Sequence, residues 1–193
     1  MVDPSKRHRE ETNDFLDRPT FAAGYFSTNE CSRIRDLSAT LAKTEGGITD
    51  KGTLESSVRS STICWMTPSE ETRWIYDKLW AAVQEVNQRY QFEILGIREV
   101  QIAHYHQGDF FDWHLDFGKT ETSSRKLSLS VQLSSPDDYV GGEFLIHGYE
   151  NEKPVKEIGS VIVFPSYLSH RVNEVSAGER WSLVAWVHGP PFR

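Results

Sequence analysis

The clearest candidates for chemistry are the imidazole of His114 and the carboxylate of Asp116, two positions apart. In an extended chain, side chains at this spacing point to the same side, so both groups would face a common point. We expect a third metal ligand from His170, which follows the apolar segment 161–164. Two histidines and one carboxylate on one face of an octahedron are typical of non-haem Fe(II) oxygenases. Taken alone, the first pair could equally be a surface histidine beside a solvated aspartate.

Arg180 and Ser182 form the second candidate group. Arg180 lies ten residues after His170, and Ser182 is two positions further on. A guanidinium and a hydroxyl on one strand face can bind a carboxylate. Beside an iron site, the expected carboxylate is the distal end of 2-oxoglutarate. The alternative for Arg180 is an exposed salt bridge, which would contribute little to stability.

Two predicted helices precede the strands that must carry these residues. Ser27 and Glu30 have capping-box spacing, and apolar positions at helical intervals follow, which predicts a helix over 29–43. A second start signal at Thr67-Pro68-Ser69-Glu70 predicts a helix over 68–90.

After residue 91 the apolar period changes from 3.6 to 2. Two helices followed by many short strands indicate a mostly β domain, a sandwich or jelly roll with helices on one face. We predict strands over 100–105, 127–133, 143–147, 161–164 and 180–188.

Composition limits the possible partners and location. The 193 residues include 21 Lys and Arg against 28 Asp and Glu, a net charge of −7, which disfavours a nucleic-acid partner. No apolar run reaches about 18 residues, so we expect no membrane span. Two cysteines, Cys31 and Cys64, are too few for a disulfide framework, and with no secretory signal they predict a cytoplasmic protein. We expect a mobile tail over 1–14 and a single domain over 15–193.

The motifs after residue 98 resemble those of Fe(II)/2-oxoglutarate dioxygenases of the prolyl 4-hydroxylase-like type, in particular the bacterial PKHD-type hydroxylases. The resemblance covers about residues 98–188. It rests on Tyr105-x-x-Gly108-x-Phe110-Phe111-x-x-His114-x-Asp116, on 127–134, Pro136-Asp137-Asp138-Tyr139 and Gly141-Gly142-Glu143, and on 160–165, His170 and Arg180.

The resemblance implies a double-stranded β-helix buttressed by two or three N-terminal helices. It implies Fe(II) bound by His114, Asp116 and His170, with 2-oxoglutarate and O2 as cosubstrates and ascorbate as a possible reductant. Arg180 would bind the C5 carboxylate, with Ser182 as a weaker contact. The resemblance and the shared strand face add three further cofactor-binding candidates: Tyr105, Gln132 and Ser128. Gln132 stands where relatives often carry a tyrosine.

The implied activity is hydroxylation of an unactivated C–H bond with release of succinate and CO2. Related halogenases lack the carboxylate ligand, so Asp116 favours hydroxylation. The preferred substrate is a prolyl residue in a peptide or protein, and a free amino acid or small metabolite is the alternative. A non-catalytic jelly-roll binding module is the alternative from another class.

Substrate contacts are expected from a segment ahead of the second helix and from the last strand. Arg59-Ser60-Ser61 resembles an Arg-x-Ser segment near the peptide groove of prolyl 4-hydroxylases. We expect it to close over the substrate beside Trp186 and His188, and the Gly-bearing segment 45–57 before it is suited to such closing. Core packing is the alternative for Trp186, and a hydrogen-bonded rim position is the alternative for His188. The substrate-binding candidates are Arg59, Ser61, Phe111, Trp186 and His188.

Two further pairs are not assigned to the active site. His104 and His106 form the HxH pattern found in cupins, but their spacing to a glutamate or a further histidine fits a cupin poorly. We therefore do not expect them to bind a metal ion. Cys64 and Trp65 are expected to pack in the core.

Overall fold

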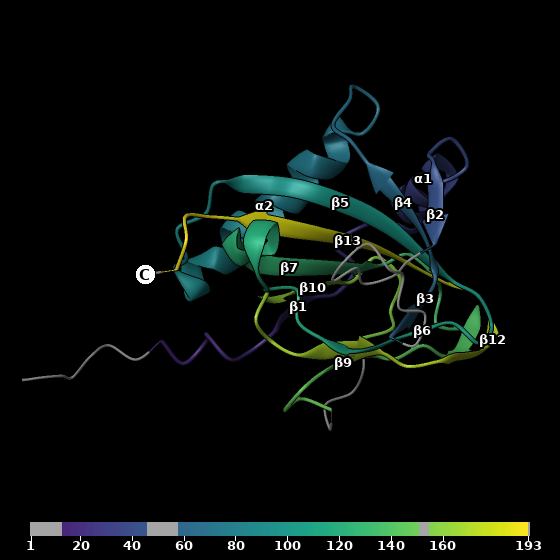
Figure 1. The fold of residues 1–193 in the computed structure, drawn as a ribbon. Helices are drawn as coiled ribbons and strands as arrows, with labels where there is room; N and C mark the ends of the chain where they lie inside the picture. Colours follow the sequence, from purple (N-terminus) through teal and green to yellow (C-terminus); the bar gives the residue numbers. More distant parts are fainter. Residues whose placement is uncertain (1–12, 46–57, 151–154, 193) are drawn as a thin grey trace, which may run out of the picture.

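The computed structural model describes residues 13–45, 58–150 and 155–192 (Figure 1). The predicted tail 1–14, apart from its last two residues, and nearly all of the predicted closing segment 45–57 lie outside the described residues. The described chain forms three antiparallel sheets, the two larger of which face each other, and both α-helices lie on the outer side of the largest one (Figure 1).

The larger sheet supplies the frame of the domain. All its neighbouring strands are antiparallel. Their order is β1 (Thr20–Ala22), β10 (Val161–Pro165), β7 (Arg125–Gln132), β13 (Arg180–His188), β5 (Gly96–Tyr105), β4 (Thr62–Met66) and β2 (Lys43–Glu45).

The smaller sheet closes the interior from the other side (Figure 1). Its order is β3 (Arg59–Ser60), β6 (Phe110–His114), β11 (His170–Val172) and β9 (Phe144–Ile146), while β8 (Tyr139–Gly141) pairs with β12 (Val175–Gly178). This arrangement confirms the predicted double-stranded β-helix.

The hydrophobic core lies between the larger sheet and the helices α1 (Thr28–Leu37) and α2 (Arg73–Tyr90). One stripe of α2 packs on alternate residues of β5, β7 and β13. Each fully buried leucine or isoleucine of this layer contributes roughly 1.5–3 kcal/mol to folding. The layer includes Ile75, Leu79, Val83, Val100, Ile102, Leu129, Leu183 and Ala185.

The opposite face of the larger sheet carries buried polar side chains on its central strands, beside apolar ones such as Phe164 on β10. On β7, Ser128, Ser130 and Gln132 alternate with the leucines and are at most 3% exposed. Ser182 on β13 and Gln101 on β5 are equally buried. Burying polar groups costs free energy unless they find partners, so this face is built for a polar interior between the sheets.

The helix ends differ from the sequence-based boundaries. The capping box of α1 is confirmed, because the amide of Glu30 donates to Ser27 Oγ and the amide of Ser27 donates to Glu30 Oε2. However, α1 ends at Leu37, not at residue 43, because the chain must turn and extend into β2.

The predicted start of α2 is wrong by five residues. The expected partner Glu70 makes no capping box. Instead the amide of Ser69 donates to Thr72 Oγ1 at 2.9 Å, and the amide of Thr72 donates to Ser69 Oγ at 3.3 Å. The helix therefore begins at Arg73. Neither described helix is long and apolar enough to cross a membrane.

We predict that Glu30→Gln destabilises the protein at neutral pH. Hydrogen bonds from Lys78, at 2.7 and 2.8 Å, and from Ser27 lower the pKa of Glu30 from 4.5 to about 2. A lowered folded-state pKa contributes stability above pH 4.5, and this is lost as the pH falls towards 2. Urea unfolding should show a loss of about 1 kcal/mol at pH 7 that shrinks below pH 4.5. Asp77→Asn, which breaks the exposed Arg73–Asp77 pair, is the control and should cost less than about 0.5 kcal/mol.

Candidate active site

Three potential metal ligands meet in the interior between the sheets. His114 ends β6, Asp116 follows two residues later, and His170 begins β11. His114 and His170 are direct partners across the β6–β11 pair. The distance from His114 Nε2 to Asp116 Oδ1 is 3.9 Å, and that from His170 Nε2 to Asp116 Oδ2 is 3.5 Å. All three side chains are buried.

The backbone orients both imidazoles for ligation. Nδ1 of His114 lies 2.7 Å from the carbonyl oxygen of Asp112, and Nδ1 of His170 lies 2.9 Å from that of Leu168. Each Nδ1 therefore carries the proton that it donates, which leaves both Nε2 atoms as acceptors facing Asp116. The ring of Phe111 stacks on His114 at 3.4 Å between centroids and further fixes that ring.

The electrostatics of the triad favour the ligating forms. Burial, followed by the neighbouring imidazole of His170, lowers the pKa of His114 to about 3, so this ring is neutral at pH 7. Burial opposes ionisation of Asp116, but His170 and His114 outweigh it and keep the pKa of its carboxyl below the usual value. Asp116 Oδ2 is buried without a hydrogen-bond partner among the described residues. Two acceptor nitrogens and an unsatisfied carboxylate oxygen fit a divalent iron ion.

A buried guanidinium group faces the same interior. Arg180, at the start of β13, is 1% exposed. Its Nη2 donates to Gln132 Oε1 at 2.9 Å and its Nη1 to Ser182 Oγ at 3.4 Å, while Nε has no described partner. Within the described ranges no carboxylate pairs with it. The guanidinium lies 5.4 Å from the ring centre of Tyr105.

Gly142 makes room for this arginine. Its φ is +60°, and a Cβ added there would lie 2.9 Å from Arg180 Cδ. The Gly-Gly turn of the motif is therefore required both for its backbone conformation and for the space that Arg180 occupies.

The triad and Arg180 share one cavity of about 430 Å³, its open mouth included. Apolar side chains form much of its wall, including Leu129, Phe144, Phe164, Val172 and Val184. The expected residues that line it are His114, Asp116, His170, Arg180, Tyr105, Ser182, Arg59, Phe111 and Trp186.

Three expected site residues act from behind the cavity wall. Gln132 orients Arg180 through its amide oxygen. Ser128 Oγ lies 3.0 Å from Ser166 Oγ and helps to lower the pKa of Asp116. Ser61 Oγ accepts a hydrogen bond of 2.8 Å from Arg59 Nε. These side chains position their neighbours and are not themselves part of the lining.

His188 does not lie at the cavity mouth, contrary to expectation. It is 1% exposed, with Nδ1 2.7 Å from Ser124 Oγ and Nε2 2.6 Å from Glu99 Oε2. The residues skipped near the end of β13 are Arg98 on β5 and Lys126 on β7, so β13 keeps its own alternation, and His188 reaches Glu99, the cross-strand partner of Trp186, outside the cavity lining. With both nitrogens occupied, His188 is a structural residue.

Trp65 differs from its expected place in the core. Cys64 is buried as predicted, but Trp65 is 45% exposed and its ring lies 6.0 Å from that of Trp186. As neighbours on β4, the two residues point to opposite faces of the sheet. This alternation is the sequence signal that could have placed Trp65 on the cavity side.

We predict that Asp116→Ala weakens Fe(II) binding by about 100-fold or more, because it removes one of three ligands. Anaerobic calorimetric titration measures the affinity. Asp112→Ala is the matched control, since Asp112 contributes only its backbone carbonyl to the triad and its carboxylate faces Arg171 at 3.8 Å. Equal affinities of Asp116→Ala and the unmodified protein would contradict the assignment.

Comparisons with known proteins agree with this geometry. Residues 100–188 match the model of the 2OG-Fe(II) oxygenase superfamily. A PKHD-type hydroxylase of Parvibaculum lavamentivorans is 37% identical over 89 residues, which are 46% of this chain and 41% of that protein. The match therefore spans less than half of that relative.

Solved structures show the same fold over most of the chain. A Pseudomonas putida prolyl-4-hydroxylase has a TM-score of 0.69 at 20% identity, covering 89% of this chain and 92% of that one. A prolyl hydroxylase from Trichoplax adhaerens, in complex with a hypoxia inducible factor peptide fragment, has a TM-score of 0.71 at 16% identity, covering 92% and 89%. The segment that carries the triad and Arg180 is thus similar in sequence to the 2OG-Fe(II) oxygenase superfamily and to PKHD-type hydroxylases, and most of the chain shares the fold of prolyl hydroxylases.

Proposed function

We propose that this chain is an Fe(II)- and 2-oxoglutarate-dependent dioxygenase that hydroxylates an unactivated C–H bond and releases succinate and CO2. One observation carries the proposal: a buried triad that needs a cation and a buried arginine that needs an anion face the same cavity. A 2-oxoglutarate molecule meets both needs, because one end can chelate a metal ion and the other is a carboxylate.

His114, Asp116 and His170 would hold the iron, and Arg180 the distal carboxylate. Iron and 2-oxoglutarate, together with O2, would supply the oxidising chemistry when they are bound. The chain itself has to bind and orient the substrates, and it has to exclude water from the cavity. Tyr105 and Ser182 lie beside the guanidinium, and the apolar wall of Phe144, Phe164 and Leu129 keeps the remaining volume dry.

The energetics of Arg180 support this role. A buried charge without a partner costs several kcal/mol, because lost hydration is not replaced. Gln132 and Ser182 replace part of that hydration with neutral oxygen atoms. A carboxylate replaces it with a charge-assisted pair, which is stronger and can be bidentate.

The preferred substrate of this proposal is a prolyl residue in a peptide or protein. Trp186 lines the cavity, and Trp65 extends the aromatic surface outwards, which suits a flat apolar ring. The guanidinium of Arg59 lies over Phe111 and can donate to a substrate carbonyl or carboxylate. The Trichoplax neighbour was solved with a peptide, which adds support by analogy of fold.

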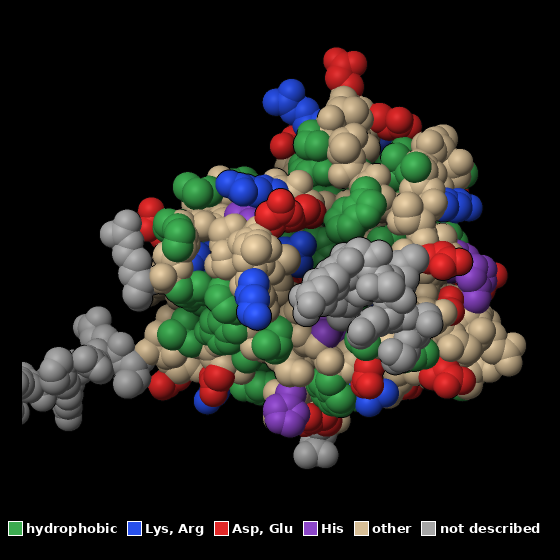
Figure 2. Space-filling model, in the orientation of Figure 1, with side chains coloured by type: hydrophobic (Ala, Val, Ile, Leu, Met, Phe, Trp, Pro, Cys, Tyr) green, Lys and Arg blue, Asp and Glu red, His purple; other side chains and the backbone are tan. Residues whose placement is uncertain are grey.

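The charge of the chain bears on the class of partner that it can bind. The net charge of −7 disfavours a nucleic-acid partner. On the face drawn in Figure 2, Lys and Arg side chains are scattered among acidic and apolar ones and form no continuous patch. A cytoplasmic location and reduction of the iron by ascorbate stay predictions.

We predict that Arg180→Ala raises the apparent dissociation constant of 2-oxoglutarate by about two to three orders of magnitude. Removing one partner of a buried charge pair costs roughly 3–5 kcal/mol, at about 1.4 kcal/mol per decade. The visible charge-transfer band of the anaerobic Fe(II)–2-oxoglutarate complex reports the binding. Arg171→Ala, on the neighbouring smaller sheet, is the control and should bind normally. An unchanged constant for Arg180→Ala would remove this residue from the site, and absence of the band in the unmodified protein would favour a non-catalytic binding module.

We predict that Trp65→Ala lowers kcat/KM for the true substrate by about 2–12-fold and leaves the charge-transfer band intact. This range corresponds to one aromatic contact of about 0.5–1.5 kcal/mol. Trp113→Ala, which removes another partly exposed tryptophan on β6, is the control. Mass spectrometry for the gain of one oxygen, over prolyl peptides and free amino acids, identifies the substrate. Oxygen gained only by free amino acids would contradict the prolyl-peptide proposal.

A further inference from the structure

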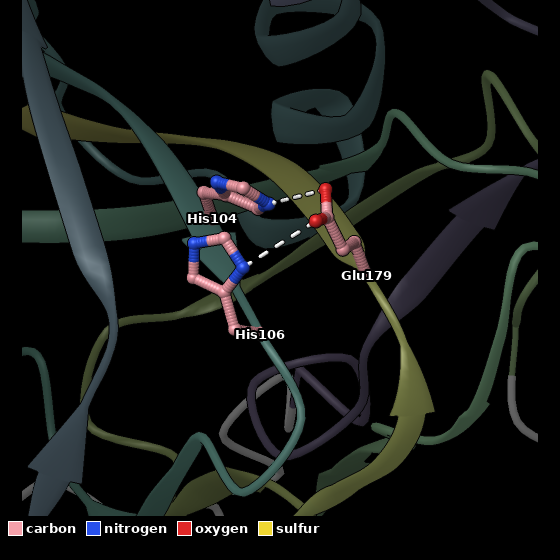
Figure 3. A group of neighbouring side chains, drawn as sticks. All are labelled: His104, His106 and Glu179. Carbon is pink, nitrogen blue, oxygen red and sulfur yellow. Dashed lines mark hydrogen bonds and ion pairs between the residues drawn. The ribbon is translucent and has the colours of Figure 1, made fainter.

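A second cluster of potential metal ligands lies outside the candidate active site. It consists of His104, His106 and Glu179 (Figure 3). His104 Nε2 is 3.0 Å from Glu179 Oε2, and His106 Nδ1 is 3.5 Å from Glu179 Oε1. The ligand atoms of all three residues lie within 4.8 Å of one another. Figure 3 shows both rings turned towards the same carboxylate.

The cluster lies where the end of β5 meets the start of β13, two strands that are far apart in the sequence. His104 lies on β5 and His106 directly after it, while Glu179 lies between β12 and β13. The indole of Trp181, the cross-strand partner of His104, stacks on its ring at 3.5 Å and 15°. This contact holds His104 in one orientation, whereas His106 and Glu179 are more than half exposed and free to adjust.

We propose that His104, His106 and Glu179 form a second metal site, which binds a divalent transition metal ion of the zinc type. Two imidazoles and one carboxylate are a ligand set that zinc accepts, with water as a fourth ligand. Bond lengths of about 2.0–2.2 Å place neighbouring ligands of a tetrahedral ion roughly 3.4 Å apart. The observed separations of 3.0 and 3.5 Å agree with that spacing.

The local electrostatics identify Glu179 as the essential ligand. Among the three ligands only Glu179 brings a carboxylate, and its two oxygen atoms face one imidazole each. The carboxylate of Glu179 is therefore the group that must compensate the charge of a bound ion, and its neutral isostere should lose most of the affinity.

The position of this site links it to the proposed cosubstrate pocket. His104 and His106 flank Tyr105, Glu179 precedes Arg180, and Tyr105 and Arg180 are direct cross-strand partners. Tyr105 and Arg180 line the interior, while His104 and Trp181 occupy the opposite face of the same strands. A bound ion would thus fasten the two strand ends that hold Arg180. This consequence rests on the proposed function, whereas the metal site itself does not.

Two measurements with zinc test the site. Calorimetric titration of the purified chain measures the affinity, and elemental analysis after dialysis counts the bound equivalents. We expect two equivalents in the unmodified protein and one in His114→Ala/Asp116→Ala, which lacks two ligands of the first triad. Adding Glu179→Gln to that background should weaken the remaining site by about 100-fold. His106→Ala should act similarly, and both changes are at exposed positions that leave the His104–Trp181 stack in place.

The matched control is His147→Ala in the same background. His147 Nδ1 lies 3.0 Å from Glu150 Oε1, which makes an exposed His–Glu pair without a second histidine. Its removal should leave the remaining equivalent bound. The proposal is overturned if the His114→Ala/Asp116→Ala protein binds no zinc, or if Glu179→Gln and His106→Ala bind it as tightly as their parent. Failure of the first triad to bind Fe(II) would instead count against the proposed function and leave this result intact.

Discussion

The burial of the Arg180 guanidinium is the constraint on which the arrangement of the interior depends. A cation with so little exposure requires hydrogen-bond acceptors around it, and β7 and β13 supply them through Gln132 and Ser182. It also requires space, which Gly142 provides by lacking a Cβ. No carboxylate of the described chain pairs with this charge, so a positive charge stays uncompensated in the interior and a bound anion can neutralise it.

The larger sheet can tolerate this buried charge because one of its faces forms the hydrophobic core and the other faces the cavity. Its outer face carries leucines, valines and isoleucines that pack under α1 and α2 and provide most of the apolar burial. Its inner face carries serines and glutamines on the central strands, which contribute little hydrophobic stabilisation, beside apolar side chains such as Phe164 that line the cavity. Alternation along each strand separates the two roles residue by residue, so the polar interior can be shaped by ligand binding with little disturbance of the core.

Much of this could be predicted from the sequence because the larger elements are periodic. The stripe from Ile75 to Tyr90 and the alternation along β7 identify α2 and the central strand. The short strands β1, β3 and β11 escape such prediction, since two or three residues hold no period and their pairing is decided by tertiary contacts. His188 shares the strand face of Trp186, but the period of β13 does not reveal that Ser124 and Glu99 occupy both of its ring nitrogens outside the cavity lining. Glu179 was missed because only the β5–β13 pairing brings it to His104. Ligands from distant segments can be proposed from spacing only where a known motif fixes that spacing.

The direct pairing of His114 with His170 across β6 and β11 has a consequence for how the protein matures. A slip of one residue between these short strands would turn one imidazole to the outside and separate the two nitrogens. The proposed iron ion would bind only the correctly paired smaller sheet. Because its binding free energy would stabilise that pairing alone, the ion would favour the native register over a slipped one.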